Sequence, residues 1–248
     1  MRYLVLSDIH ANLEALEAVL EAAAADRYDA VAVLGDLVGY GADPNAVVER
    51  VRALAPVAII RGNHDKVAAG LDNADGFNPT AQESAAWTER EITQDTRQYL
   101  AALPQGPALL DGFVEICHGS PVDEDTYIFG EMDAAEALAA SERQVCLFGH
   151  THLPTAASMG EDRVLDVLFH GARDQHRIAL DDGRRYLINP GSVGQPRDGD
   201  PRAAYAILDT STREIVIRRV AYPVDRACDR ILASGLPKAL GQRLVRGR

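Results

Sequence analysis

Short apolar runs alternate with amphipathic stretches over the first sixty residues. Apolar runs at 3–6, 31–34 and 57–60 predict three short strands. Between them, apolar residues recur at helical spacing after Asn12 and again after Asp43-Pro44, which predicts two helices that each begin at a capping residue. The pattern predicts a βαβαβ unit with parallel strands, right-handed crossovers and functional loops at the carboxyl ends of the strands.

The pattern changes in the middle of the chain. A capping-box sequence from Thr80 to Glu83 predicts the start of a helical stretch that ends by Pro104. Two apolar strands, at 114–117 and 145–148, are separated by an alanine-rich helix that we expect to begin near Asp133.

Strand signals prevail in the second half and predict a more antiparallel sheet. The expected strands are 164–169, 177–180, 185–188, 204–208 and 214–220. From Tyr222 onward, one or two terminal helices are expected, interrupted by Gly235 and Pro237. The absence of a linker signal predicts a single domain over 1–248, with 222–248 as its helical tail.

Composition and charge narrow the class of protein. The chain has 248 residues, 47% of them hydrophobic and 25% charged, as expected of a globular domain. The net charge of −12 disfavours a nucleic-acid partner. Three isolated cysteines indicate neither a disulfide framework nor a thiolate metal site. No segment approaches the ~20 apolar residues of a membrane span, and the apolar run at the N-terminus is too short for a signal peptide. We therefore expect a cytoplasmic protein without a membrane partner.

Polar groups that could carry chemistry follow five of the predicted strands. They are Asp8-Ile9-His10, Gly35-Asp36, Gly62-Asn63-His64-Asp65, His118-Gly119 and Gly149-His150-Thr151-His152. Because ligands bind at the carboxyl ends of the strands in an α/β sheet, the five loops should converge on one site. Residues two apart on an extended segment point to the same side, so Asp8 can act with His10, and His150 with His152.

The donor set favours a transition-metal site. Imidazole mixed with oxygen donors, and no thiolate, suits manganese, iron or zinc better than calcium or magnesium. About eight donors exceed the needs of one ion and suit two ions that share a carboxylate. Any one motif could be an ordinary turn, cap or surface histidine. Their joint order after successive strands is what favours metal binding.

The ordered set resembles the five-motif signature of the calcineurin-like metallophosphoesterases. Within that superfamily, the sequences from Ser7 to Asn12, from Gly35 to Gly41 and from Asn189 to Val193 resemble the small single-domain phosphodiesterases of bacteria and archaea. The resemblance implies an α/β fold, a four-layer αββα sandwich. It also implies two divalent transition-metal ions, with manganese first and iron, zinc or nickel as alternatives.

The resemblance also implies a role for each matching residue. One metal would be held by Asp8, His10, Asp36 and His152, and the other by Asp36, Asn63, His118 and His150. Asp36 would bridge the two ions as a catalytic residue, and His64 would be catalytic through contact with the substrate. The protein-phosphatase branch has an aspartate that orients this histidine at the position of Gly39. This difference argues against that branch and leaves open which group orients His64.

These features predict a phosphodiesterase that hydrolyses a small phosphate ester with a metal-bridging hydroxide as nucleophile. A phosphomonoesterase or nucleotidase, a nuclease of the same superfamily, and a non-catalytic scaffold are the alternatives. Arg61 and Arg197 could contact substrate phosphate, although isolated arginines more often form surface ion pairs. The loop from Asn189 to Gly194 could support the site or serve only as a tight turn. A homo-oligomer is compatible with the sequence.

Overall fold

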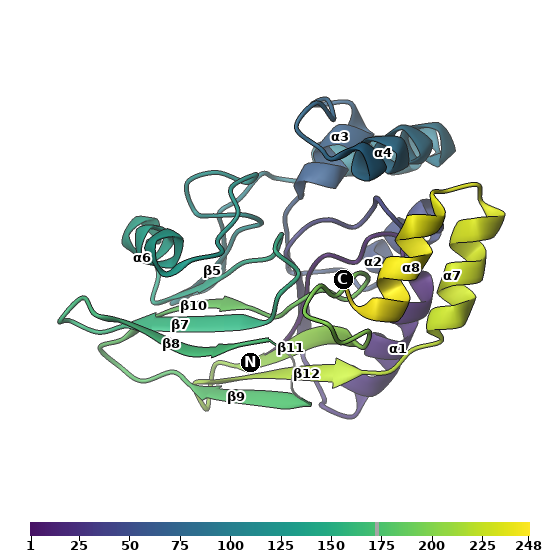
Figure 1. Ribbon diagram of the computed structural model, residues 1–248. Coiled ribbons are helices and arrows are strands. Elements are labelled where there is room, and N and C mark those ends of the chain that lie inside the picture. The colour runs from purple at the N-terminus through teal and green to yellow at the C-terminus, as the bar shows by residue number, and fades with distance from the viewer. Residues whose placement is uncertain (172–173) are drawn as a thin grey trace.

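The computed structural model describes residues 1–171 and 174–248, apart from the side chain of residue 170, and contains two facing six-stranded sheets (Figure 1). Across the first sheet the order is β3 (Ala58–Ile59), β2 (Ala30–Val33), β1 (Arg2–Leu6), β11 (Ala203–Asp209), β12 (Glu214–Val220) and β9 (Gln175–Ala179). The strands β1, β2 and β3 are parallel, as predicted, whereas β11, β12 and β9 continue the sheet in antiparallel fashion.

The second sheet is also mixed. Its order is β4 (Ala108–Asp111), β5 (Val114–Ile116), β6 (Val145–Leu147), β10 (Arg185–Asn189), β7 (Thr155–Met159) and β8 (Leu165–His170). The central strands β5, β6 and β10 are parallel, and the outer ones are antiparallel to their neighbours. The sequence pattern did not predict β4 and β7.

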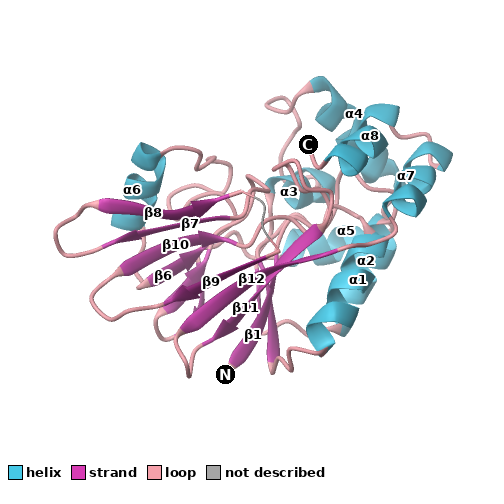
Figure 2. Ribbon diagram, turned by 60° about the horizontal axis from the view of Figure 1, so that its bottom comes forward, coloured by secondary structure: helices cyan, strands magenta, loops and turns pink. Residues whose placement is uncertain are grey.

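Helices cover the outer faces of the two sheets (Figure 2). The helices described in the structure are α1 (Leu13–Ala24), α2 (Pro44–Ala53), α3 (Asn63–Ala69), α4 (Pro79–Glu91), α5 (Gln94–Ala102), α6 (Glu131–Ala140), α7 (Val224–Ala233) and α8 (Lys238–Arg246). The two terminal helices lie beside α1 on the first sheet, and α6 lies on the second. This arrangement is the four-layer αββα sandwich that the resemblance implied.

The alternation of side chains along β1 explains the layers. Leu4 and Leu6 face the helices, in one buried cluster with Leu16 and Val19 of α1. Tyr3 and Val5 face the other sheet, in the cluster that fills the space between the sheets. Since successive residues of a strand point to opposite faces, a strand apolar on both faces must lie between two packed layers.

Three local predictions need correction. The capping box at Thr80 is wrong, because α4 begins earlier and Asn78 accepts the capping hydrogen bond from the Ala81 amide. The helical stretch is also divided, with α5 starting anew after the capping residue Thr93. Asp43 precedes α2 as expected but makes no capping bond with its side chain, which pairs with Arg230 of α7 instead.

The terminal segment forms α7 and α8, as predicted, and both helices are anchored in the core. Ile231, Leu240 and Leu244 are buried in the cluster between the first sheet and its helices. Among the residues described, none of the helices is both long enough and apolar enough to cross a membrane.

Candidate metal centre

The seven predicted metal ligands and His64 all come together at one edge of the two sheets. Asp8 and His10 follow β1, Asp36 follows β2, Asn63 and His64 open α3, His118 follows β5, and His150 and His152 follow β6. Each of these side chains is buried. The segment 62–65 was expected to be a loop, but its last three residues form the first turn of α3, so Asn63 and His64 are presented by a helix.

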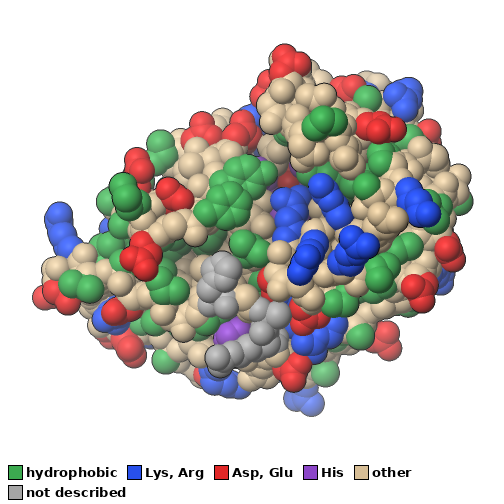
Figure 3. Space-filling model, viewed as in Figure 1, with side chains coloured by type: hydrophobic (Ala, Val, Ile, Leu, Met, Phe, Trp, Pro, Cys, Tyr) green, Lys and Arg blue, Asp and Glu red, His purple; other side chains and the backbone are tan. Residues whose placement is uncertain are grey.

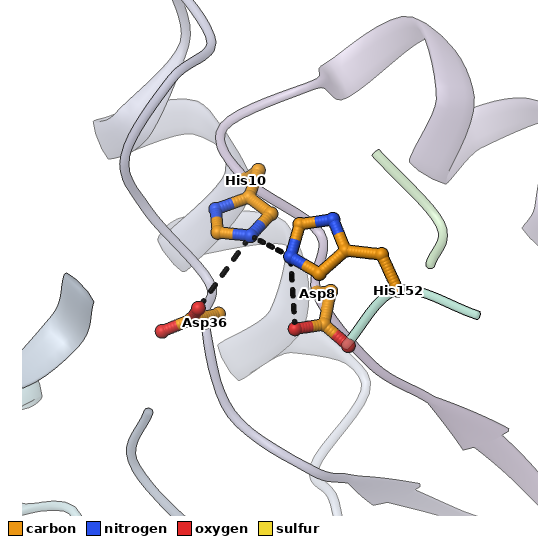
Figure 4. Close-up of side chains that lie close together, drawn as sticks. All are labelled: Asp8, His10, Asp36 and His152. Carbon is orange, nitrogen blue, oxygen red and sulfur yellow. Dashed lines mark hydrogen bonds and ion pairs between the residues drawn. The ribbon is translucent and has the colours of Figure 1, made fainter. Parts of the chain in front are cut away.

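The ligand atoms form two groups that share one carboxylate. Within each group, one potential ligand atom from each residue lies within 4.8 Å of those of the others. One group consists of Asp8, His10, Asp36 and His152 (Figure 4), and the other of Asp36, His118 and His150. The Asn63 Oδ1 atom lies 3.3 Å from His118 Nε2, next to the second group.

The histidine hydrogen bonds determine which ring nitrogen of each side chain faces the site. His10 and His152 each direct Nδ1 at a backbone carbonyl, that of Val38 at 3.0 Å and that of Gln195 at 2.6 Å. A carbonyl only accepts hydrogen bonds, so both Nδ1 atoms carry the proton and both Nε2 atoms present lone pairs. Those two Nε2 atoms lie 3.0 Å apart. Two lone pairs at this distance repel each other unless a cation lies between them, so the residues fit a metal.

Backbone carbonyls also orient the rings of His118 and His150. The carbonyl of Leu34 lies 2.7 Å from His118 Nδ1, and the carbonyl of Asp125 lies 3.1 Å from His150 Nε2. Each ring therefore has its other nitrogen left for a ligand role, Nε2 in His118 and Nδ1 in His150. A backbone carbonyl that fixes the tautomer of a ligating histidine is typical of protein metal sites.

Asp36 is the electrostatic centre of the cluster. Its Oδ2 atom lies 3.5 Å from His10 Nε2 and 3.4 Å from His118 Nε2, between the two groups. Burial alone would raise the pKa of Asp36, but the imidazoles of His118 and His64 hold it well below its usual range. Burial opposes charge on His118, yet the Asp36 carboxylate raises the pKa of His118 to about 10. A metal that binds His118 must therefore displace a proton at neutral pH.

Asp8, the second carboxylate of the site, differs from Asp36 in the direction of its pKa shift. Burial raises the pKa of Asp8 to about 6, against the opposing charge of His118. Its carboxylate accepts hydrogen bonds from the Ser7 hydroxyl at 2.6 Å and from the His150 amide at 3.1 Å. These donors hold Asp8 in position, but they supply less charge than a cation would.

The backbone of the site is strained at most of the predicted ligands. Positive φ angles occur at Asp8 (52°), His10 (49°), Asp36 (54°), His150 (65°) and His152 (62°). This region costs a residue with a side chain about 1–2 kcal/mol. Hydrogen bonds between the loops hold the strained backbone, such as those from the Asp8 amide to the Gly35 carbonyl and from the His10 amide to the Asp36 carbonyl. Such strain gathers at functional sites.

The role of one supporting residue, Asp65, was missed by sequence reasoning. Asp65 is fully buried and accepts hydrogen bonds from the amides of Leu37, Val38 and Gly62, which ties the second loop to the third. Its place in the Gly-Asn-His-Asp motif was the available signal. The loop after β10 does support the site, since the Ser192 hydroxyl donates to the Asp8 carbonyl at 2.7 Å.

His64 is oriented by packing and not by an acid. Its ring lies 4.4 Å from the Tyr40 ring and 4.6 Å from the Phe77 ring, measured between centroids. Its Nδ1 atom is buried without a hydrogen-bond partner among the described residues. Gly39 packs against that atom so closely that a Cβ at this position would lie 2.4 Å from it. Burial lowers the pKa of His64 to about 4, although Asp36 acts in the opposite direction.

The two candidate arginines differ in their surroundings. Arg61 forms a two-pronged ion pair with Glu124, with both N–O distances 3.0 Å, which matches the ordinary structural role. Arg197 instead lies over the Tyr40 ring, 5.6 Å from its centroid, and donates to Gln195 Oε1 at 3.0 Å. Only Arg197 is therefore left with a guanidinium that a substrate could engage.

The fold and the site together define a metal-binding phosphoesterase. The model of the calcineurin-like phosphoesterase superfamily domain matches residues 1–213, so the chain belongs to this family and is a metallophosphoesterase, a hydrolase that acts on phosphate esters. The protein MJ0912 of Methanocaldococcus jannaschii is 36% identical over 246 residues, which cover 98% of this chain and 97% of that protein. Phosphodiesterase YfcE of Escherichia coli is 26% identical over 226 residues, or 87% of this chain and 91% of YfcE.

Solved structures agree with this assignment. A metallophosphoesterase from Sphaerobacter thermophilus is 40% identical, with a TM-score of 0.87 over 100% of this chain and 99% of that one. Protein PH1004 from Pyrococcus horikoshii OT3 has the same fold at 23% identity, with a TM-score of 0.78 over 100% of this chain and 98% of that one.

Proposed function

We propose that this metallophosphoesterase is a phosphodiesterase that works with two divalent transition-metal ions, manganese in the first place and iron, zinc or nickel as alternatives. Asp8, His10, Asp36 and His152 would hold one ion, and Asp36, Asn63, His118 and His150 the other. The observation that carries the proposal is the pair of buried ligand groups that share Asp36. A phosphodiesterase among the relatives supports the choice of diesters over monoesters.

The residues of the chain would divide the work of hydrolysis. Two bound cations would lower the pKa of a shared water, so that hydroxide is available as the nucleophile, and would neutralise the phosphoryl oxygens. The backbone carbonyls of Val38, Gln195 and Leu34 would keep three of the imidazoles turned towards the ions. Asp36 would take part in both sites through Oδ2, while its Oδ1 accepts a hydrogen bond from the His64 amide at 2.9 Å.

His64 would meet the substrate through Nε2, because Gly39 blocks the Nδ1 edge of the ring. With its pKa lowered to about 4, the imidazole is neutral at physiological pH. A proton on Nε2 leaves the buried Nδ1 as an unprotonated atom, which avoids burying an N–H group without an acceptor. His64 would then donate a hydrogen bond to a phosphoryl or leaving-group oxygen.

Metal analysis and diester hydrolysis together test the proposal. The purified chain should bind close to two manganese ions and hydrolyse bis(p-nitrophenyl) phosphate faster than p-nitrophenyl phosphate. Glu136→Gln, a change of an exposed carboxylate on α6, is the matched control and should keep both properties. One ion per chain with full activity would refute the binuclear centre. Faster cleavage of the monoester would favour the phosphomonoesterase, and no turnover with any metal would favour the scaffold.

A further inference from the structure

A basic hollow lies directly beside the metal centre. It has a volume of about 480 Å³ and is lined by Arg197, Arg243, Arg246, Arg248, Tyr40 and Tyr127, among others. We name it the arginine pocket. Figure 3 shows Lys and Arg side chains gathered at the middle of this face, next to an elongated hydrophobic patch. The volume is within the ~300–1,000 Å³ of small-molecule sites.

The arginine pocket continues into the hollow that reaches the predicted ligands. A neighbouring hollow of about 450 Å³ is lined by Asn63 and His150, and the two hollows share Tyr40 and Tyr127 as walls. The Tyr40 ring lies 4.7 Å from the His10 ring and 5.6 Å from the Arg197 guanidinium. A molecule bound at the metal centre could therefore extend into the arginine pocket.

The arginines of the arginine pocket form no ion pair within the described structure. None of its lining residues is acidic, and no described carboxylate lies within 4.0 Å of the guanidinium groups of Arg197, Arg243 or Arg246. Arginines elsewhere, such as Arg61 and Arg219, do pair with carboxylates. In a chain with a net charge of −12, several adjacent arginines without a carboxylate partner repel one another, and an anion would relieve this repulsion.

The arginines of α8 are held in position by the rest of the fold. Leu240 and Leu244 of this helix are buried in the core. Past its end, the Gly247 carbonyl accepts a hydrogen bond from the Gly199 amide at 2.8 Å. Because the helix is anchored on both sides, binding of an anion would require little ordering of the backbone, which favours affinity.

We propose that the arginine pocket binds a second phosphate group of the ester substrate, while the reacting phosphate lies at the metal centre. The inference rests on the proposed function, since it treats the pocket as part of the substrate site. The substrate class is then a small phosphoester that carries at least two phosphate groups. Arg197 would lie between the two phosphates, and Arg243 and Arg246 would contact the distal one. Tyr127, which is 42% exposed and stacks on both His150 and Phe129, is a wall shared by the two hollows that such a substrate would occupy.

Calorimetry on the manganese-loaded protein tests the pocket without relying on turnover. The ligands are 5′-AMP, which has one phosphate, and ADP and adenosine 3′,5′-bisphosphate, which have two. Charge-assisted hydrogen bonds to the second phosphate should make at least one of the two ligands with two phosphates bind wild type on the order of tenfold more tightly than 5′-AMP. We call this ratio of affinities the affinity advantage. It should disappear in the double variant Arg243→Ala/Arg246→Ala, and most of it should remain in Arg243→Lys/Arg246→Lys.

Arg226→Ala is the matched control. It removes one positive charge from α7, as Arg246→Ala alone does from α8. Arg226 is 71% exposed and pairs with Glu14 outside the pocket, so the affinity advantage should be unchanged. Should the double variant fail to fold, Arg246→Ala alone, at an exposed position, should still reduce the advantage.

Three results would overturn the proposal. They are equal affinity of wild type for all three ligands, an advantage that survives in the double alanine variant, and an equal loss in Arg226→Ala. Hydrolysis of bis(p-nitrophenyl) phosphate is measured in parallel. Absence of hydrolysis with the advantage intact would remove the proposed function and still support the anion site. Hydrolysis without any affinity advantage for the second phosphate would support the proposed function and remove the anion site.

Discussion

Gly39→Ala should disable catalysis while leaving the metal ligands in place. Gly39 has a φ of 86°, and a Cβ there would lie 2.4 Å from His64 Nδ1 and 2.9 Å from His64 Cγ. Both distances are shorter than any stable contact, so either the imidazole or the backbone must move. The ring has little room to do so, because Tyr40 and Phe77 pack against it with ring centroids 4.4 and 4.6 Å away.

Two separate effects determine the magnitude. The positive φ costs alanine about 1–2 kcal/mol, which in a chain of this size lowers the melting temperature by about 2–4 °C for each kcal/mol. Relief of the clash requires a ring displacement on the order of 1 Å, and a misplacement of that size can reduce turnover about 10²-fold. We therefore expect moderate destabilisation together with a loss of kcat near two orders of magnitude.

Gly183→Ala separates the two effects. Gly183 has a φ of 82°, but nothing lies within 4 Å of the added Cβ, so this variant has the backbone strain without the clash. Melting curves, manganese content and kcat for bis(p-nitrophenyl) phosphate are measured for both variants. Gly183→Ala should lose stability alone, and Gly39→Ala should also lose turnover with both ions retained. Turnover in Gly39→Ala equal to that in Gly183→Ala would refute the idea that Gly39 sets the position of His64.

Three further predictions concern the metal centre. Asp36→Asn should lower manganese occupancy at both sites, because Asp36 belongs to both ligand groups, whereas His10→Ala should weaken one site more than the other. Elemental analysis decides this, and loss of a single ion in Asp36→Asn would contradict it. Chelation should lower the melting temperature, and manganese should restore it, because cations relieve the repulsion among the buried carboxylates and lone pairs. An unchanged melting curve after verified metal removal would show that the centre does not stabilise the fold. His64→Ala should keep both ions but slow hydrolysis ~10²–10⁴-fold, more for a diester that releases an alkoxide than for one that releases nitrophenolate. Equal losses on the two esters would assign His64 to stabilising the phosphoryl oxygens alone.

Local chemistry made much of the fold predictable. Asn12 caps α1 by accepting a hydrogen bond from the Ala15 amide, as its place before a periodic apolar stretch indicated. The order of polar motifs after successive strands predicted that distant loops would meet, and they do so at one edge of the sheets. Two capping predictions were wrong, one because a nearby residue competed for the role and the other because a distant residue bound the capping side chain. Asn78 is the cap of α4 in place of Thr80, and Asp43 pairs with Arg230 across 187 positions instead of capping α2.

The sequence by itself therefore indicated the alternating first half of the fold and, through the order of its motifs, the family, because periodicity and motif order depend on residues that are close in the chain. The αββα architecture and the predicted ligands followed from the resemblance to that family. Tertiary structure alone decided how those ligands are arranged. The carbonyls of Val38, Leu34 and Gln195 select which nitrogen of a histidine faces the site, and no pattern near the histidines indicates them. The arginine pocket likewise combines Tyr40 with α8, some two hundred positions later. Such contacts depend on how layers pack, which is a property of the whole chain.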